Sequence, residues 1–274
     1  MKKVSFNING TTIEYDVDGD TAYGSDQVLL EEDDNLISGT DWSQRGYTIQ
    51  PFLSPSENEV IRSGLKSTLI GTMREFTSVD ESTFTLEKYH EFVDNDLHSK
   101  ITGALRGGFR VANFPGGISR VEKRVSQICG VELTSTCPAV GWGGYFIRIV
   151  RPHLKTDNNP PHRDVWLAIL RSCVNIYFPL AGSDERSALP IVPGSHLWRE
   201  SDIERTAKGA KVDTATYQVP SVTSWKKSLE LERPNPQKDE VMVFTPYAIH
   251  GGGINLSPDS TRMSLEARFW RRPT

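Results

Sequence analysis

The chain has 274 residues, 37% of them hydrophobic, and a net charge of -4, a composition that predicts one large globular domain, alone or with an appendage. The acidic balance and the lack of a basic stripe exclude nucleic acid as the expected partner, and no apolar run nears the roughly 18 residues of a membrane span. The three cysteines show no CxxC spacing, so they indicate neither a disulfide framework nor a zinc site, and they fit a reducing cytoplasm.

The N-terminal segment predicts a β-hairpin. Apolar and polar residues alternate on both sides of Asn9-Gly10, a dipeptide that favours a two-residue hairpin turn. An acidic stretch, EEDDNLISGTD, follows and is expected to be a solvated connection. We therefore expect residues 1–42 to form an N-terminal extension and residues 43–274 to form the main domain.

The first half of the main domain predicts helices. Ser54 and Glu57 form a capping box, so a short strand should lead into a helix at this point. Residues 85–101 and the run ISRVEKRVSQIC carry apolar residues at helical spacing. His90 and His98 lie in the first of these two segments, and we expect both to face solvent.

From about residue 139 the sequence predicts a β-rich half. Short runs rich in aromatic and β-branched residues are separated by Gly, Pro, Asn and Asp, which is typical of a sandwich or barrel. Residues 200–239 look poor in strands and exceed ordinary loop lengths, so we expect a lid or insert there. The expected architecture is mainly β with a helical buttress.

The triplet His162-Arg163-Asp164 does not indicate a kinase. A kinase catalytic loop needs an asparagine five residues after the aspartate, and that position is Ile169. The chain also lacks a DFG motif and a suitable glycine-rich loop. The kinase interpretation therefore fails.

A metal site is the better hypothesis for this triplet. If it lies on a strand, His162 and Asp164 point to the same face. A third ligand must come from elsewhere, with His153, His196 and His250 as candidates. His250 ends an apolar run and enters three glycines, whereas His196 lies in a Pro-Gly-Ser turn sequence and is expected to be structural. Two histidines and one carboxylate form the facial arrangement of non-haem Fe(II) oxygenases.

Arg262 and Ser264 sharpen this hypothesis. They open the run RMSLEARFW and would point the same way from a strand. A guanidinium offers a two-pronged contact to a carboxylate, and a hydroxyl adds one more donor. This pair suits the distal end of a dicarboxylate co-substrate.

Together these motifs resemble the Fe(II)- and 2-oxoglutarate-dependent dioxygenases, most of all the phytanoyl-CoA dioxygenase-like branch. The resemblance rests on His162-x-Asp164, VPGSH, the His250-Gly-Gly-Gly run and Arg262-x-Ser264 in this order. It covers roughly residues 45–272 and implies a double-stranded β-helix (jelly-roll, cupin-like) core. It also implies that the two histidines and the aspartate bind Fe(II), that Arg262 and Ser264 bind 2-oxoglutarate, and that O2 is the second co-substrate.

Substrate residues are harder to infer from the sequence. Arg148 lies on the expected strand before the metal motif and would need an anionic partner, either 2-oxoglutarate or the substrate. Trp166 would share a face with the ligands by alternation, and Asn175 and Tyr177 share a face of the run VNIYF. Arg268 is a rival to Arg262 as the co-substrate anchor, but no serine lies two positions after it.

The expected activity is oxidation of a small molecule at an unactivated C–H bond, with 2-oxoglutarate and O2 converted to succinate and CO2. A carboxylate at Asp164 leaves no coordination position for a halide, so hydroxylation, desaturation or cyclisation is favoured over halogenation. Three alternatives remain open: a cupin-like metalloenzyme that does not use 2-oxoglutarate, a non-catalytic metal-binding β-barrel, and an oxygenase acting on a peptide. The sequence does not indicate an oligomeric state.

Overall fold

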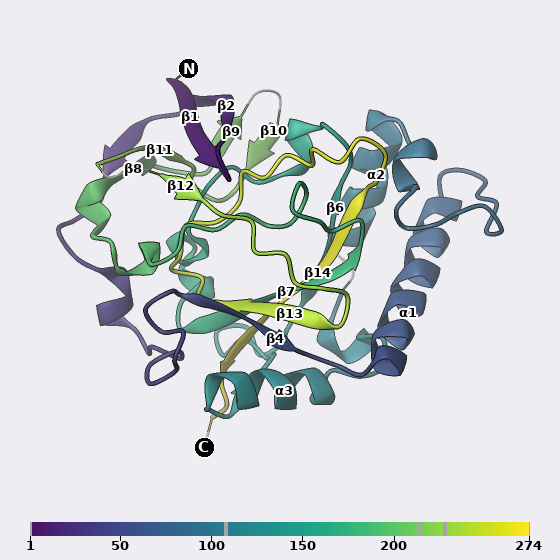
Figure 1. The fold of residues 1–274 in the computed structure, drawn as a ribbon, viewed down its shortest axis with the longest axis horizontal. Coiled ribbons are helices and arrows are strands. Elements are labelled where there is room, and N and C mark those ends of the chain that lie inside the picture. Colours follow the sequence, from purple (N-terminus) through teal and green to yellow (C-terminus); the bar gives the residue numbers. More distant parts are fainter. Residues whose placement is uncertain (1, 107–108, 213–214, 227–228, 274) are drawn as a thin grey trace.

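The computed structural model describes residues 2–106, 109–212, 215–226 and 229–273. In this part of the chain the strands form three sheets, and three α-helices flank the largest of them (Figure 1). None of the helices described is both long and apolar enough to cross a bilayer.

The largest sheet has six antiparallel strands, in the order β4-β13-β7-β14-β5, with β6 also paired to β14. The central strand β7 is buried along its whole length because both of its faces are covered. The strands of this sheet are β4 (Tyr47–Pro51), β5 (Leu133–Thr134), β6 (Tyr145–Val150), β7 (Cys173–Ala181), β13 (Glu240–Phe244) and β14 (Arg262–Arg271).

The helices cover one face of this sheet. They are α1 (Pro55–Arg74), α2 (Asn95–Arg106) and α3 (Ser119–Cys129). The capping box at the start of α1 is confirmed, since the side chain of Ser54 accepts from the Glu57 amide and the Glu57 carboxylate accepts from the Ser54 amide. Leu65 and Leu69 of α1 belong to the same buried core as Ile176 of β7.

Alternation along β14 separates the core from the polar residues of the sheet. Apolar side chains at one parity join the helix-side core: Met263, Leu265, Ala267 and Phe269. Since successive side chains on a strand point to opposite faces, the other parity lies on the face away from the helices. These polar residues are Arg262, Ser264, Glu266 and Arg268.

The N-terminal hairpin belongs to a second sheet, in the order β10-β9-β2-β1-β12, beside a three-stranded sheet, β11-β8-β3. The hairpin turn is confirmed: Asn9 and Gly10 adopt φ of 47° and 79°, as a two-residue turn with left-handed residues requires. The strands are β1 (Lys2–Ile8), β2 (Thr11–Asp18), β3 (Thr21–Tyr23), β8 (Ile203–Thr206), β9 (Ala210–Val212), β10 (Ala215–Tyr217), β11 (Val222–Trp225) and β12 (Glu230–Leu231).

The expectation that residues 200–239 are poor in strands is wrong. Strands β8 to β12 all lie in this interval, and each has only two to four residues, too few to give a clear alternation. Several of them pair with the N-terminal segment, β12 with β1, β9 with β2 and β8 with β3. The prediction of a mainly β, jelly-roll type fold with a helical buttress is confirmed, and the described strands do not close into a barrel.

Candidate metal centre and adjoining pocket

His162, Asp164 and His250 come together in a buried group whose possible ligand atoms all lie within 4.8 Å of one another. The Asp164 Oδ1 atom lies 3.2 Å from His162 Nε2 and 3.8 Å from His250 Nε2. Of the three histidines proposed as the third ligand, only His250 belongs to this group. His196 instead donates from Nε2 to the carbonyl of Ser43.

The backbone that carries these residues is not a continuous strand, so the premise that His162 and Asp164 lie on one is wrong. His162 and His250 form an isolated antiparallel bridge, with backbone N···O distances of 2.9 and 3.0 Å. The chain then turns into a short 3-10 helix, Asp164–Trp166. This turn, rather than strand alternation, brings the carboxylate to the imidazoles.

Both histidines are oriented by backbone carbonyls. His162 Nδ1 donates to Pro160 O at 2.7 Å, and His250 Nδ1 donates to Ala248 O at 3.0 Å. A hydrogen bond from one ring nitrogen fixes the ring and the tautomer, and it leaves the other nitrogen free for a metal. Each Nε2 is therefore directed toward Asp164 as a potential ligand.

Asp164 is held by two side chains that leave one of its oxygens available. Asn175 Nδ2 and Arg268 Nη2 donate to Oδ2 at 2.9 and 2.8 Å. Asn175 of β7 and Arg268 of β14 are direct cross-strand partners, so the register of the sheet places both donors against the same oxygen. The other oxygen, Oδ1, faces the two histidines.

The electrostatics favour the protonation states that bind metal. Burial alone would raise the pKa of Asp164, but the Arg268 guanidinium and the nearby histidines outweigh it and hold that pKa well below its ordinary value. Burial, reinforced by the neighbouring His162 ring, lowers the pKa of His250 to about 4. A carboxylate and a neutral imidazole are the forms that coordinate a cation. This donor set fits Fe(II).

Arg262 and Ser264 lie on the same face of β14 as Arg268. Both are buried, with 2% and 0% of their surface exposed. Among the described residues, Arg262 Nε and Nη1 and Ser264 Oγ find no hydrogen-bond partner. Buried polar groups are nearly always satisfied in folded proteins, so three orphaned groups on neighbouring residues indicate a missing ligand. Their chemistry fits a carboxylate.

A pocket connects Arg262 to the metal group. It encloses about 500 Å³ of empty space, part of it open to solvent. Arg262 lines it, whereas Ser264 is not among its lining residues. The polar and aromatic residues that line it include Arg148, Asn158, His162, Asp164, Asn175, Phe244, His250, Glu266 and Arg268.

Residues 42–264 match the family described as phytanoyl-CoA dioxygenase (PhyH). The chain belongs to this family. The search of curated proteins gives no match. The protein is an oxygenase that depends on Fe(II), 2-oxoglutarate and O2, which sets aside the metalloenzyme without 2-oxoglutarate and the non-catalytic barrel.

Solved structures with a similar fold are distant in sequence. EctD from S. alaskensis, solved with 2-oxoglutarate and 5-hydroxyectoine, is 12% identical, with a TM-score of 0.49 over 94% of this chain and 86% of that one. The non-heme alpha ketoglutarate dependent epimerase SnoN from nogalamycin biosynthesis is 14% identical, with a TM-score of 0.44 over 84% of this chain and 79% of that one. AviO1 from Streptomyces viridochromogenes Tue57 is 15% identical, with a TM-score of 0.44 over 92% of this chain and 99% of that one.

The substrate residues expected from the sequence fare differently in this PhyH-family oxygenase. Arg148 lines the pocket, and its anionic partner within the chain is Glu266, at 3.4 Å. Asn175 lines the pocket but is engaged with Asp164. Tyr177 lies outside the lining. Its ring is 5.6 Å from the Arg262 guanidinium, and its hydroxyl bonds Ser183.

Trp166 does not line this pocket. Its expected orientation assumed a strand, but the residue ends the 3-10 turn that follows Arg163. The indole N–H donates to the Glu200 carboxylate at 2.9 Å, and Glu200 also forms a buried ion pair with Arg163. The structure therefore places Trp166 in a neighbouring polar cluster.

Three residues of the pocket were missed or misassigned from the sequence. Arg268 is not a rival co-substrate anchor, because it binds Asp164. Glu266 lies four residues after Arg262 on β14, so both side chains point to the same face of the sheet. This alternation could have predicted Glu266 as a pocket residue. Asn158 lines the pocket with a buried Nδ2 that has no partner among the described residues, and nothing in its sequence context distinguishes it from an ordinary turn residue.

Proposed function

We propose that this oxygenase hydroxylates a small molecule at an unactivated C–H bond. In this proposal His162, Asp164 and His250 hold Fe(II), and Arg262 with Ser264 binds the distal carboxylate of 2-oxoglutarate. The observation that carries it is the combination of three orphaned donors on Arg262 and Ser264 with the ligand group lining the same pocket as Arg262. Bound Fe(II), with 2-oxoglutarate and O2, supplies the oxidant, and 2-oxoglutarate leaves as succinate and CO2.

The contribution of the protein is orientation and charge. Arg262 presents a buried fork to a carboxylate, in surroundings where an ionic hydrogen bond is stronger than in water. Asp164 keeps its charge because Arg268 compensates it. Because Asp164 is a carboxylate, no ligand position is left for a halide, which favours hydroxylation, with desaturation and cyclisation as the other outcomes.

A small molecule is the substrate class that the pocket supports. It is a concave site in which charged and polar side chains converge beside the metal group, as is typical of small-molecule sites. Arg148 is the residue we propose for substrate contact, since about a third of its side chain is exposed and it lines the pocket beside Glu266. A substrate with an anionic or hydrogen-bond-accepting group suits this position.

Formation of succinate tests the proposal. Purified protein with Fe(II), 2-oxoglutarate and O2 is incubated with and without pools of small molecules, and succinate is quantified. The product mass then separates hydroxylation, which adds one oxygen atom, from desaturation or ring closure, which removes two hydrogens. Absence of iron-dependent succinate from a folded protein across all pools would contradict the proposal.

The variant Arg262→Met with Arg271→Met as its control makes the test specific. Arg271 lies on the same strand, but it is half-exposed and pairs with Asp34. Loss of a charged hydrogen bond costs about 1.5–3 kcal/mol, so Arg262→Met should raise the KM for 2-oxoglutarate about 10- to 100-fold. Arg271→Met should leave it unchanged.

A further inference from the structure

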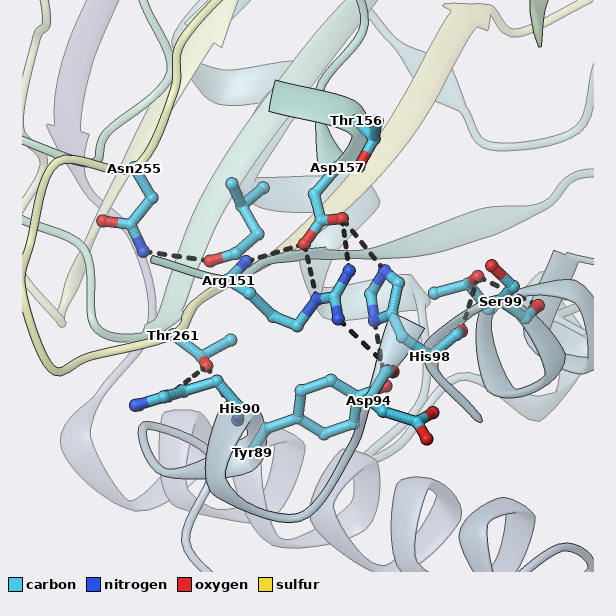
Figure 2. Close-up of polar contacts among 12 residues, drawn as sticks. Tyr89, His90, Asp94, His98, Ser99, Arg151, Thr156, Asp157, Asn255 and Thr261 are labelled. Atoms are coloured by element: carbon cyan, nitrogen blue, oxygen red, sulfur yellow. Dashed lines mark hydrogen bonds and ion pairs between the residues drawn. The ribbon is translucent and has the colours of Figure 1, made fainter. Parts of the chain in front are cut away.

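A buried polar network lies outside the pocket. It joins the helical segment 87–98 to the chain that leads to His162. Asp157 accepts from Arg151 through both of its oxygens, at 2.9 Å each, and also from the Arg151 backbone amide at 3.0 Å. His98 Nε2 lies 3.4 Å from Asp157 Oδ1, and His98 Nδ1 lies 3.1 Å from the Tyr89 hydroxyl. Figure 2 shows Arg151 and His98 converging on Asp157, with Tyr89 against His98.

The network is closed to solvent. The side chains of Asp157, Arg151 and His98 are 2%, 6% and 9% exposed. The expectation that His98 faces solvent is therefore wrong: a break before α2 turns it inward, toward β6. Burial lowers the pKa of His98 to about 4, so the ring is neutral; its Nδ1 accepts from the Tyr89 hydroxyl, and its Nε2 faces Asp157 Oδ1 at 3.4 Å. Among the described residues, the hydrogen bonds that the Asp157 carboxylate accepts come from Arg151, and His98 packs against it.

Asp157 begins the segment that presents the first metal ligand. It ends a single 3-10 turn, and residues 158 and 159 after it line the pocket. The Asn159 carbonyl accepts from the Gly252 amide at 2.7 Å, and the Pro160 carbonyl accepts from His162 Nδ1 at 2.7 Å. Two successive prolines, Pro160 and Pro161, make this stretch stiff. Fixing its start at Asp157 therefore also restricts the position of its end at His162.

The same helical segment also contacts the chain before Arg262. His90 Nδ1 lies 2.9 Å from the Thr261 hydroxyl (Figure 2). The Thr261 amide donates to the Glu87 carbonyl at 2.7 Å. Residues 87–98 therefore hold both the segment that leads to His162 and the residue that precedes Arg262. Neither contact lies in the pocket itself.

We propose that Asp157 is a positioning residue for the metal centre, held by Arg151 and His98 so that the segment 158–162 directs His162 toward the metal. The inference rests on the proposed role of His162 as a ligand. Asp157 does not touch the metal and acts through the Pro160 carbonyl. Its loss therefore loosens the metal site by more than the accompanying loss of stability explains.

The test compares Asp157→Asn with the matched control Glu122→Gln. Glu122 is likewise a largely buried carboxylate, which accepts from the Ser135 amide and hydroxyl and from Arg272. It joins α3 to the chain after β5, and none of these partners lines the pocket. For both variants, thermal unfolding, Fe(II) affinity by anaerobic titration, and amide hydrogen exchange in the iron-free protein are measured.

The expected result is specific to Asp157→Asn. Residues that orient metal ligands typically contribute about 10- to 100-fold to metal affinity, and we expect a loss at the lower end of this range. In the iron-free protein the amides of His162 and Gly252 should exchange faster than in the wild type, because both are bonded to the positioned segment or its partner. Glu122→Gln should lower the unfolding temperature without either effect.

Equal Fe(II) affinity and equal exchange of these amides in Asp157→Asn and Glu122→Gln would overturn the inference. If Asp157→Asn does not fold, His98→Leu removes the imidazole that faces Asp157 and leaves Arg151 compensated, and the same comparison applies to it. A wild-type protein that binds no Fe(II) would contradict the proposed function instead, while the exchange of the His162 and Gly252 amides would still decide whether Asp157 positions the segment.

Discussion

At the scale of single residues, two arginines six positions apart on β14 differ because of what each one meets. Arg268 is satisfied by Asp164, whereas Arg262 retains two orphaned nitrogens among the described residues. Both side chains point to the pocket face of the strand, so the alternation of the sequence cannot tell which of them binds Asp164. The difference arises from the turn that carries Asp164 to one end of the strand.

The variant Arg268→Gln tests the role assigned to Arg268. Without the guanidinium, Asp164 loses its main compensating charge and one of the two donors that hold Oδ2. We expect Fe(II) affinity to fall about 10- to 100-fold, as for other groups that orient metal ligands. Anaerobic titration measures it, with Arg271→Gln on the same strand as the control. Unchanged affinity in Arg268→Gln would show that Asn175 alone orients Asp164.

The buried His98 predicts a pH dependence of stability. Its pKa is lowered by burial to about 4 in the folded protein, whereas the unfolded chain protonates it near 6.5. Between these values the unfolded state binds the extra proton, so the free energy of unfolding falls as pH falls, and the full contribution is present above 6.5. The groups that face His98 are Tyr89, Asp157, Arg151 and, more distantly, Arg106.

Chemical denaturation across this window checks that prediction. The wild type should lose up to about 3 kcal/mol more than His98→Gln between pH about 6.5 and about 4. The comparison with the variant removes the contribution of other groups that titrate in the same range. Parallel stability curves for the two proteins would show that His98 does not contribute.

At the scale of elements, the three glycines after His250 allow two loops to approach each other. Gly251 has φ of +94°, and a Cβ there would lie 2.9 Å from the Pro160 carbonyl and 3.1 Å from His162 Nδ1. A side chain would therefore push against the contact that orients His162. The glycine run and the Asn-Asn-Pro-Pro segment therefore pack so closely that a side chain at Gly251 would displace one of them.

Substitution of Gly251 by alanine should damage the site more than the fold. We expect a loss of about 1–3 kcal/mol in stability from the strained backbone, with loss of most Fe(II) binding. Gly71→Ala is the control, because Gly71 lies in α1 with nothing near its Cβ and alanine there should add about 0.5–1 kcal/mol. Thermal unfolding and metal titration distinguish them. Normal Fe(II) binding by Gly251→Ala would show that the close approach is dispensable.

The elements that the sequence predicts well are those with local signals. The hairpin at Asn9-Gly10 and the capped helix at Ser54 are set by short motifs whose physics is local. Strands β8 to β12 escape prediction because two to four residues give no periodicity, and they form by pairing with one another and with β1 to β3. The partners of Asp164 escape for a similar reason, since the register between β7 and β14 is a tertiary property.

At the scale of the whole molecule, the N-terminal hairpin reaches the glycine run beside the metal group. Phe6 of β1 is buried against Tyr15, with ring centroids 5.6 Å apart, and a Cβ on Gly252 would lie 2.7 Å from its ring. Residues near the start of the chain thus pack against the segment that follows His250.

Truncation of Phe6 tests this long-range support. Phe6→Ala should cost about 3–5 kcal/mol of stability, as removal of a buried aromatic ring usually does. It should also weaken Fe(II) binding through the glycine run. The neighbouring exposed position gives the control, Ser5→Ala, which should stay within about 0.5 kcal/mol of the wild type. Chemical denaturation measures both. A change under about 1 kcal/mol for Phe6→Ala would show that the hairpin packs loosely on the domain.

The central claim is that one pocket holds Fe(II) on His162, Asp164 and His250 and 2-oxoglutarate on Arg262 and Ser264. The most direct measurement is an anaerobic titration of the iron-free protein with Fe(II) and then 2-oxoglutarate, following the visible charge-transfer absorption of the chelate. We predict a band that is absent in His162→Ala and that needs about 10- to 100-fold more 2-oxoglutarate in Arg262→Ala. A folded, iron-binding wild type without the band, or an Arg262→Ala variant with unchanged 2-oxoglutarate affinity, would contradict the account.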